Sequence, residues 1–292
     1  MQPSAEWYYR DDGGEQVELI DTSWARCFCA DADDQGYVIW NHSSDSLSKA
    51  LDPLIDRNRK IIWRASGSGS ATMVDSRWAL TAAHLVTNSS TGFPIDVTNV
   101  KWCTMENLQE NTTGGYEAEC FDTDLITPNP TYGVNPGPVT DYAVVKLSAA
   151  PGVGWFAISQ ADDSTISSHS DYTAGYPRRT LGCGTNTGAP TVDTDYGGSH
   201  LYVAVGDIQS TPSGQVKYDT STALGMSGGI HYYCPDGPCP DGHYLTGVQT
   251  NVQATTCAGL IGTNCQGNSC AGGYSTGPKG SAIRSWVINN TP

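Results

Sequence analysis

Short apolar runs separated by turn-forming residues fill the sequence from about residue 61 to its end. Runs of this kind, bounded by Gly, Pro, Asn and Ser, are typical of strands in an antiparallel β protein. The pattern predicts strands over residues 61–64, 70–74, 78–80, 97–103, 116–120, 172–176, 201–208, 215–218, 229–233 and 244–252. No heptad repeat or long amphipathic stretch competes with this all-β interpretation.

The composition agrees with a chain that turns often. It holds 33 Gly and 16 Pro, and only 15% of its residues are charged against 38% that are apolar. A chain of 292 residues can bury a substantial core. We therefore expect one folded unit the size of a two-barrel β protein, with room for an N-terminal extension.

The formal net charge of -15 repels phosphate backbones and anionic membrane surfaces. Nucleic acid and membranes are therefore not expected as partners, and no apolar run approaches the length of a membrane span. Residues 1–50 are rich in Asp and Glu and carry no clear period. They are interpreted as a solvated extension or prosegment.

Ten cysteines, without Cys-x-x-Cys units or Cys/His spacing suited to zinc, favour disulfides in an oxidising compartment. We expect a secreted protein with no metal and no cofactor, from which the signal peptide has been removed. Bridges are plausible for Cys103 with Cys120 and for Cys234 with Cys239, and the pairing of the other cysteines is open. Four glycosylation triplets, at Asn41, Asn88, Asn111 and Asn289, fit a secreted glycoprotein.

Three short segments carry the candidate chemistry. They are Thr-Ala-Ala-His ending at His84, Asp-Tyr-Ala-Val-Val-Lys-Leu beginning at Asp141, and Gly-Met-Ser-Gly-Gly around Ser227. Each alone is common, since a histidine after a strand is more often packed or on the surface. Together, in the order His, Asp, Ser, they suit acyl transfer, with Ser227 as nucleophile, His84 as base and Asp141 as its orienting partner. The N–H groups of Gly225 and Ser227 are expected to form an oxyanion hole.

This order of residues resembles the chymotrypsin-like (trypsin-like) serine endopeptidases. The Tyr-Thr-Ala-Gly-Tyr-Pro segment at 172–177 and the Tyr-Asp-Thr-Ser-Thr segment at 218–222 are most similar to the glutamyl endopeptidase branch. The resemblance implies an all-β fold of two six-stranded antiparallel Greek-key barrels, with an N-terminal extension and a C-terminal helix over 281–288 that includes Trp286. It implies a crossover over 149–170 and the following division: residues 1–50 as the extension, 51–158 as the first barrel and 159–292 as the second.

Several positions of this sequence differ from the pattern of the chymotrypsin-like enzymes. Met226 stands where trypsin-type enzymes place the aspartate that receives a freed N-terminal amine. Lys60-Ile61 resembles a zymogen cleavage point, but Ile61 lies too close to His84, so residues 61–64 are interpreted as a barrel strand. A mature N-terminus, if one is generated, is expected around residues 36–47.

The substrate pocket is expected to hold Ser221, Thr222, Gln249 and Thr250. Ser221 occupies the floor position where a basic P1 side chain would need a carboxylate, so cleavage after Lys or Arg is not expected. Thr222 could bind a glutamate carboxylate, but Gln249 replaces the histidine that the glutamyl branch places there. Glutamate and neutral residues therefore both stay open at P1.

These observations lead to a secreted, metal-independent serine endopeptidase that acts on proteins or peptides as a monomer. Two alternatives stay open. One is a catalytically silent homologue that uses the scaffold as a binding or adhesion module. The other is a latent zymogen in which residues 1–50 cover the cleft.

Overall fold

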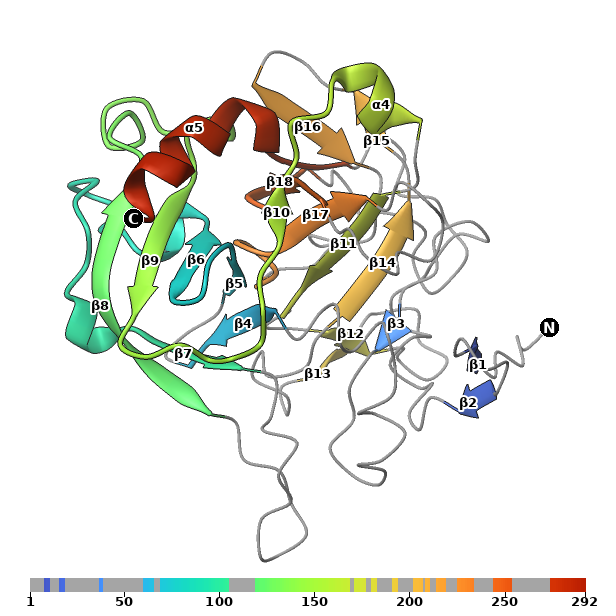
Figure 1. Ribbon diagram of the computed structural model, residues 1–292, viewed down its shortest axis with the longest axis horizontal. Helices are drawn as coiled ribbons and strands as arrows, with labels where there is room; N and C mark the ends of the chain where they lie inside the picture. Colours follow the sequence, from blue (N-terminus) through green and yellow to red (C-terminus); the bar gives the residue numbers. More distant parts are fainter. Residues whose placement is uncertain are drawn as a thin grey trace, which may run out of the picture.

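The computed structural model is built mostly of β-strands, as expected from the sequence (Figure 1). It describes residues 8–10, 16–18, 37–38, 60–65, 69–104, 119–168, 171–176, 180–182, 191–193, 202–206, 208–210, 214–218, 225–233, 244–253 and 274–292. A β-barrel forms the first half of this part of the chain, and two open sheets form the second half beside it.

The first half is a closed antiparallel barrel in the order β4-β5-β6-β9-β8-β7. Its strands are β4 (Ile61–Arg64), β5 (Ser70–Met73), β6 (Trp78–Thr81), β7 (Lys101–Thr104), β8 (Cys120–Pro128) and β9 (Ala143–Leu147). The interpretation of residues 61–64 as a barrel strand is therefore confirmed. In the β7–β8 pairing Cys103 faces Cys120, and the expected disulfide between them is formed.

Alternate residues of the barrel strands point into two different cores. On β4, Ile62 lies in the cluster that fills the barrel, whereas Ile61 lies in a second cluster shared with the other half of the molecule. Leu80 on β6 and Val144 on β9 join the shared cluster in the same way. Because successive side chains of a strand point to opposite faces, these strands are apolar on both sides and fix the second half against the barrel.

The segment expected as one strand over residues 97–103 is divided in two. Its first part forms a 3₁₀ turn, η2 (Val97–Asn99), and β7 begins only at Lys101. The cause is local, since the Asp96 carboxylate accepts hydrogen bonds from the N–H and the hydroxyl of Thr98. The strand expected over 116–120 begins at Cys120 and continues to Pro128, while residues 116–118 lie outside the described residues.

The second half contains a six-stranded sheet in the order β10-β18-β17-β11-β14-β3 and a four-stranded sheet in the order β15-β16-β20-β19. The six strands are β10 (Ala157–Ile158), β18 (Tyr244–Val248), β17 (Ile230–Tyr233), β11 (Asp171–Gly175), β14 (Tyr202–Gly206) and β3 (Tyr37–Val38). The four are β15 (Ile208–Ser210), β16 (Gln215–Tyr218), β20 (Tyr274–Pro278) and β19 (Asn251–Gln253). A closed second barrel stays a prediction, and the Cys234–Cys239 bridge lies outside the described residues.

Two short hairpins complete the strands that the structure describes. They are β1 (Tyr8–Arg10) with β2 (Gln16–Glu18), and β12 (Thr180–Gly182) with β13 (Thr191–Asp193). The crossover between the halves contains a short helix, α4 (Asp163–Ser167), which the Asp162 side chain caps by accepting the N–H of Thr165.

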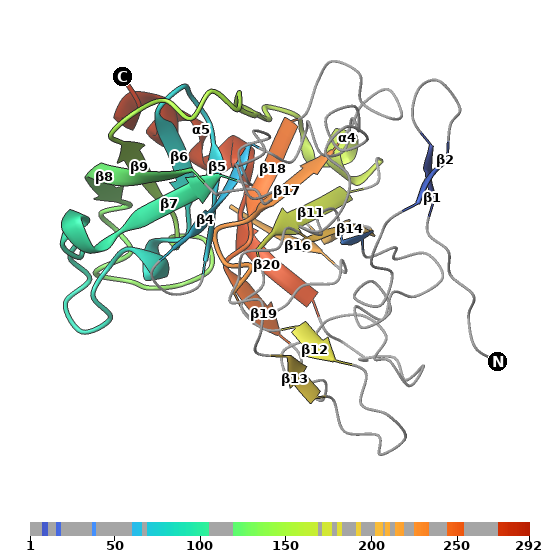
Figure 2. The same ribbon diagram turned by 90° about the horizontal axis from the view of Figure 1, so that it is seen from below.

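The expected C-terminal helix is present as α5 (Gly280–Asn290) and lies across the junction of the two halves (Figure 2). Ile283 and Val287 are buried in the shared cluster. The rings of Trp286 and Tyr142 form a T-shaped pair with their centroids 5.0 Å apart. The helix thus packs directly behind the residue that follows Asp141. Among the helices of the described residues, none has the length and hydropathy needed to cross a membrane.

Candidate functional site

His84 lies on a 3₁₀ turn, η1 (Ala83–Leu85), immediately after the buried strand β6. Two side chains hold this turn in place. Arg64 Nη1 donates to the carbonyl of Leu85 at 2.7 Å, and the Thr87 hydroxyl donates to the carbonyl of Ala83 at 2.9 Å. Burial lowers the pKa of Arg64, which still carries its charge at neutral pH because an arginine pKa starts so high. Hydrogen bonds to the carbonyls of Ala83 and Leu85 therefore hold the backbone on both sides of His84.

Asp141 holds the imidazole of His84 from one side. Its Oδ2 lies 2.7 Å from His84 Nδ1, and its Oδ1 accepts the backbone N–H of His84 at 2.9 Å. The Asp141 side chain is only 11% exposed, whereas the His84 side chain is 34% exposed. With its hydrogen on Nδ1 facing the carboxylate, the ring leaves Nε2 to accept a proton. Burial, followed by the negative charge of Asp141, raises the pKa of the neighbouring Tyr132.

Ser227 lies in a tight turn between two glycines that have left-handed backbone angles. The φ angle is 101° at Gly225 and 79° at Gly228, a region that residues with a Cβ adopt only at a cost. Within the turn, the N–H of Gly229 donates to the carbonyl of Met226 at 2.8 Å. The Gly-x-Ser-Gly pattern of the sequence is thus required by the backbone.

The turn packs against the barrel that carries His84. The carbonyl of Ser227 accepts the N–H of Ser70 at 2.7 Å, and a Cβ at position 228 would overlap the Ser70 carbonyl and the Thr81 hydroxyl. Thr81 in turn donates to the Ser70 carbonyl at 2.7 Å and lies three residues before His84. The structure therefore brings all three candidate segments to one place, although they are far apart in the sequence.

Ser70 connects this place to the second half as well, because its Oγ accepts the N–H of Tyr176 at 2.8 Å. No sequence motif singles out Ser70. The sequence shows only a serine at the start of an apolar strand. The structure shows that its hydroxyl is fully buried, and a buried polar group must find a partner. Sequence reasoning missed this connecting role because its partners come from both halves.

The N–H groups of Gly225 and Ser227, expected as an oxyanion hole, donate to no acceptor in the hydrogen bonds between described residues. Met226 is fully buried, with its carbonyl 3.3 Å and its Cβ 3.4 Å from where a Cβ on Gly175 would lie. An apolar side chain therefore fills the position where trypsin-type enzymes place a carboxylate.

Of the four expected pocket residues, the structure describes only Gln249 and Thr250. Ser221 and Thr222 lie outside the described residues. Gln249 is buried next to the Ser227 turn, since its carbonyl accepts the N–H of Gly228 at 2.6 Å and its own N–H donates to Gly229 at 2.9 Å. The hydroxyl of Thr250 donates to the carbonyl of Thr276 at 3.0 Å. Its hydroxyl hydrogen is therefore used in a bond within the protein.

A second histidine, His231, lies on β17 behind Gln249 and was not anticipated. It is fully buried between the Thr173 hydroxyl, 2.7 Å from Nδ1, and the Gln249 side-chain oxygen, 2.7 Å from Nε2. Burial lowers its pKa to about 3, which outweighs the opposite effect of the bond to Gln249. The ring is therefore neutral at physiological pH. The available signal in the sequence was a histidine inside the apolar run that follows Ser227.

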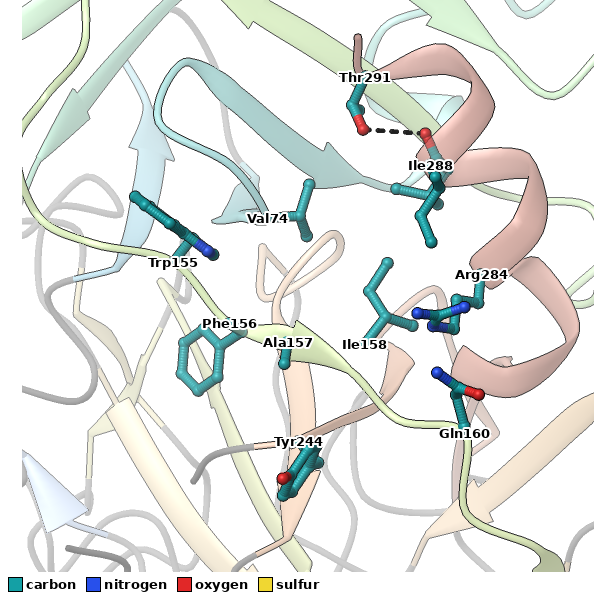
Figure 3. Close-up of a pocket in the computed structure, with 11 residues that line it drawn as sticks. Val74, Trp155, Phe156, Ala157, Ile158, Gln160, Tyr244, Arg284, Ile288 and Thr291 are labelled. Atoms are coloured by element: carbon teal, nitrogen blue, oxygen red, sulfur yellow. Dashed lines mark hydrogen bonds between the residues drawn. The ribbon is translucent and has the colours of Figure 1, made fainter. Parts of the chain in front are cut away.

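A pocket of about 330 Å³ lies elsewhere, between α5, β10 and the start of β18 (Figure 3). Trp155, Tyr244 and Ile288 are partly exposed at it, and the Arg284 and Gln160 side chains lie near one another on one side. None of the predicted site residues lines this pocket. The part of the chain that the structure describes contains no cluster of three or more His, Cys, Asp or Glu side chains placed to hold a metal ion.

Comparisons with known proteins agree with this fold. The family model described as Trypsin matches residues 57–262. Among solved structures, a Glu endopeptidase in complex with MPD superposes with a TM-score of 0.52 at 16% sequence identity, covering 80% of this chain and 90% of that chain. At this identity the likeness concerns the fold alone. No curated protein matches the sequence.

The packing of Gly228 predicts that the turn tolerates no side chain there. We expect Gly228→Ala to lower the free energy of unfolding by about 3 kcal/mol or more, because it adds overlap with Ser70 to left-handed strain. Gly152→Ala is the matched control, since Gly152 has a φ of 72° but open space around its Cβ position. Urea unfolding measures both, and equal losses for the two variants would contradict the close packing.

The buried His231 predicts acid sensitivity. Its folded pKa of about 3 lies below the ordinary histidine value, so the unfolded chain binds the extra proton first and stability falls as the pH drops through this interval. We expect His231 to account for a loss on the order of 4 kcal/mol between pH 7 and pH 3. Unfolding free energies of the protein and of His231→Gln, measured across this range, should converge at low pH. Parallel curves would contradict the assignment.

Proposed function

The chain belongs to the trypsin family, and from that premise we propose that it is a secreted serine endopeptidase using Ser227, His84 and Asp141. Family membership makes it a serine endopeptidase that acts on proteins or peptides. The observation that supports the three roles is the meeting of the Asp141–His84 pair with the Ser227 turn across Ser70 and Thr81. A nucleophile, a proton acceptor and an orienting carboxylate are the groups that acyl transfer needs.

The proposed reaction begins when Ser227 Oγ attacks the carbonyl carbon of the scissile peptide bond and its proton passes to His84 Nε2. Asp141 keeps the ring in the tautomer that accepts this proton and stabilises the resulting imidazolium. The N–H groups of Gly225 and Ser227 bind the oxyanion. His84 then gives the proton to the leaving amine as the C–N bond breaks. Water, activated by the same histidine, hydrolyses the acyl-enzyme and frees Ser227.

Secretion is supported by the cysteine content and by the disulfide between Cys103 and Cys120, because such bonds persist in oxidising compartments. We assign residues 1–50 to an acidic extension or prosegment, residues 51–158 to the first barrel and residues 159–292 to the second. Buried Met226 removes the usual acceptor for a freed N-terminus, so cleavage of an extension would act by uncovering the site.

The pocket is proposed to reject basic residues at P1. Ser221 supplies no carboxylate at the floor position, and Gln249, which is joined to the turn of Ser227, carries no charge. A cation placed there would be desolvated without a partner. Neutral residues and glutamate are the P1 residues compatible with these side chains.

Removal of the nucleophile tests the assignment directly. We expect Ser227→Ala and His84→Ala each to lower kcat on a peptide ester by about 10⁶, because the three residues act as a unit. A fluorophosphonate should label the protein covalently at Ser227 and should not label Ser227→Ala. Near-normal turnover in either variant, with circular dichroism unchanged, would refute the roles proposed here.

The P1 preference has its own test. We expect kcat/KM for P1 Lys or Arg to be at least about 10²-fold below that for the best neutral residue. Ser221→Asp should raise cleavage after Arg relative to the neutral residue, because it supplies the missing carboxylate. A peptide library cleaved by both proteins measures this ratio. Cleavage sites dominated by Lys or Arg in the unaltered protein would overturn the pocket assignment.

A further inference from the structure

The pocket between α5, β10 and the start of β18 shares no lining residue with the proposed catalytic site (Figure 3). Its volume of about 330 Å³ is that of a pocket for a small molecule. Trp155, Tyr244 and Ile288 line it and are 53%, 37% and 50% exposed. They are three of the seven large apolar side chains that are exposed in the part of the chain that the structure describes. Exposed apolar groups gathered at one concave place are typical of a binding site.

The walls of this pocket define the body of a ligand. Val74, Ile158 and Val287 add aliphatic surface beside the aromatic rings of Trp155 and Tyr244. Burial of an apolar group against such walls is favourable, and pairs of aromatic rings gain stability beyond the area that they bury. The pocket therefore suits a ligand that contains an aromatic ring.

Arg284 is the only charged side chain among the residues that line the pocket, and Figure 3 shows its guanidinium extending from α5 toward Gln160. A guanidinium can only donate, so the oxygen of the Gln160 amide is assigned to the near end, 3.2 Å from Nε and 2.9 Å from Nη2. Among the described residues, no acceptor meets Nη1 and no carboxylate pairs with Arg284. Gln160 thus orients the guanidinium and leaves Nη1 to bind an acceptor.

The acidic residues nearest to Gln160 in the sequence, Asp162 and Asp163, have other partners. Asp163 pairs with Lys279, and Asp162 caps α4 by accepting the N–H of Thr165 at 2.8 Å. The net charge of the chain is -15, so an anion is repelled by most of the surface and needs a local positive charge to bind. The guanidinium at this pocket supplies that charge.

We propose that this pocket binds an aromatic carboxylate, with the ring against Trp155 and Tyr244 and the carboxylate on Arg284. A guanidinium and a carboxylate form charge-assisted hydrogen bonds, which are stronger than those between neutral groups. A small aromatic acid and the free end of a peptide whose last residue is aromatic both carry these two groups. The inference does not depend on the proposed peptidase activity, because the residues of that reaction do not line the pocket.

The test measures binding to the folded protein that carries Ser227→Ala, so that peptides are not cleaved. The probes are 3-phenylpropionate, its neutral amide, and a peptide that ends in a free phenylalanine carboxylate. We expect 3-phenylpropionate to bind with a Kd on the order of 1 mM or below, and the amide to bind at least about 10-fold more weakly. NMR titration of the Trp155 indole N–H, assigned with Trp155→Phe, reports binding at this pocket.

Three variants separate the effect of charge from that of shape. Arg284→Met keeps a long apolar side chain, and it should weaken binding of the acid about 10-fold while the amide stays within about 2-fold. Lys101→Met is the matched control, because it removes one positive charge from an exposed ion pair that does not line the pocket, and the acid should stay within about 2-fold. Ala157→Phe fills the pocket and should weaken binding of the acid and the amide alike.

Equal binding of the acid and its amide would overturn the proposal, because the charge of Arg284 would then contribute nothing. An unchanged Trp155 signal at a concentration of acid about 10-fold above the expected Kd would overturn it as well. So would equal losses in Arg284→Met and Lys101→Met, or binding that neither Arg284→Met nor Ala157→Phe weakens, because the acid would then lie elsewhere.

The two sources of the carboxylate are told apart by the same titrations. Tighter binding of the peptide than of 3-phenylpropionate assigns the pocket to the ends of polypeptide chains, and the reverse assigns it to small acids. Fluorophosphonate labelling of the unaltered protein tests the proposed function separately. A protein that fails to label but binds the acid through Arg284 would refute the proposed function and support this inference.

Discussion

The close approach of the Ser227 turn to the carbonyl of Ser70 is the constraint on which the site depends. Gly228 must lack a side chain for the turn to reach the barrel, and only then does the N–H of Ser70 meet the carbonyl of Ser227 at 2.7 Å. The same carbonyl of Ser70 accepts the hydroxyl of Thr81, on the strand that leads to His84. Backbone packing thus places the turn that carries Ser227 against the strand that leads to His84.

His84 and His231 lie in the same region but have very different surroundings. His84 is partly exposed and lies beside the carboxylate of Asp141. His231 is buried among uncharged partners, and the cost of desolvating a charge keeps it neutral. The first is the residue proposed to transfer a proton, and the second is a buried, neutral part of the core. A charge at His231 would weaken the site, whereas a charge at His84 is part of the proposed reaction.

The C-terminal helix packs against the residue that follows Asp141. Trp286 on α5 contacts Tyr142, the next residue after Asp141, and the helix itself is anchored by Ile283 and Val287 in the core shared by both halves. The last segment of the chain therefore contributes to the geometry of residues that lie near its middle. Packing of this kind restricts the movement of the backbone that carries Asp141.

Local sequence was sufficient for most of the short strands and for the C-terminal helix, because apolar alternation and turn residues act over a few positions. It also indicated the bridge between Cys103 and Cys120. The segments expected as single strands over 201–208 and 244–252 are each divided between the six-stranded and the four-stranded sheet. Local sequence also singled out His84, Asp141 and Ser227, whose order along the chain is readable without a structure. The prediction of a strand at residues 97–99 was wrong, because the Asp96 carboxylate accepts the N–H of Thr98 and stabilises a turn there. Only the tertiary structure decided the roles of Ser70, Gly228 and His231. Their partners are distant in sequence, and a buried polar group is defined by what folds around it, which no local pattern can specify.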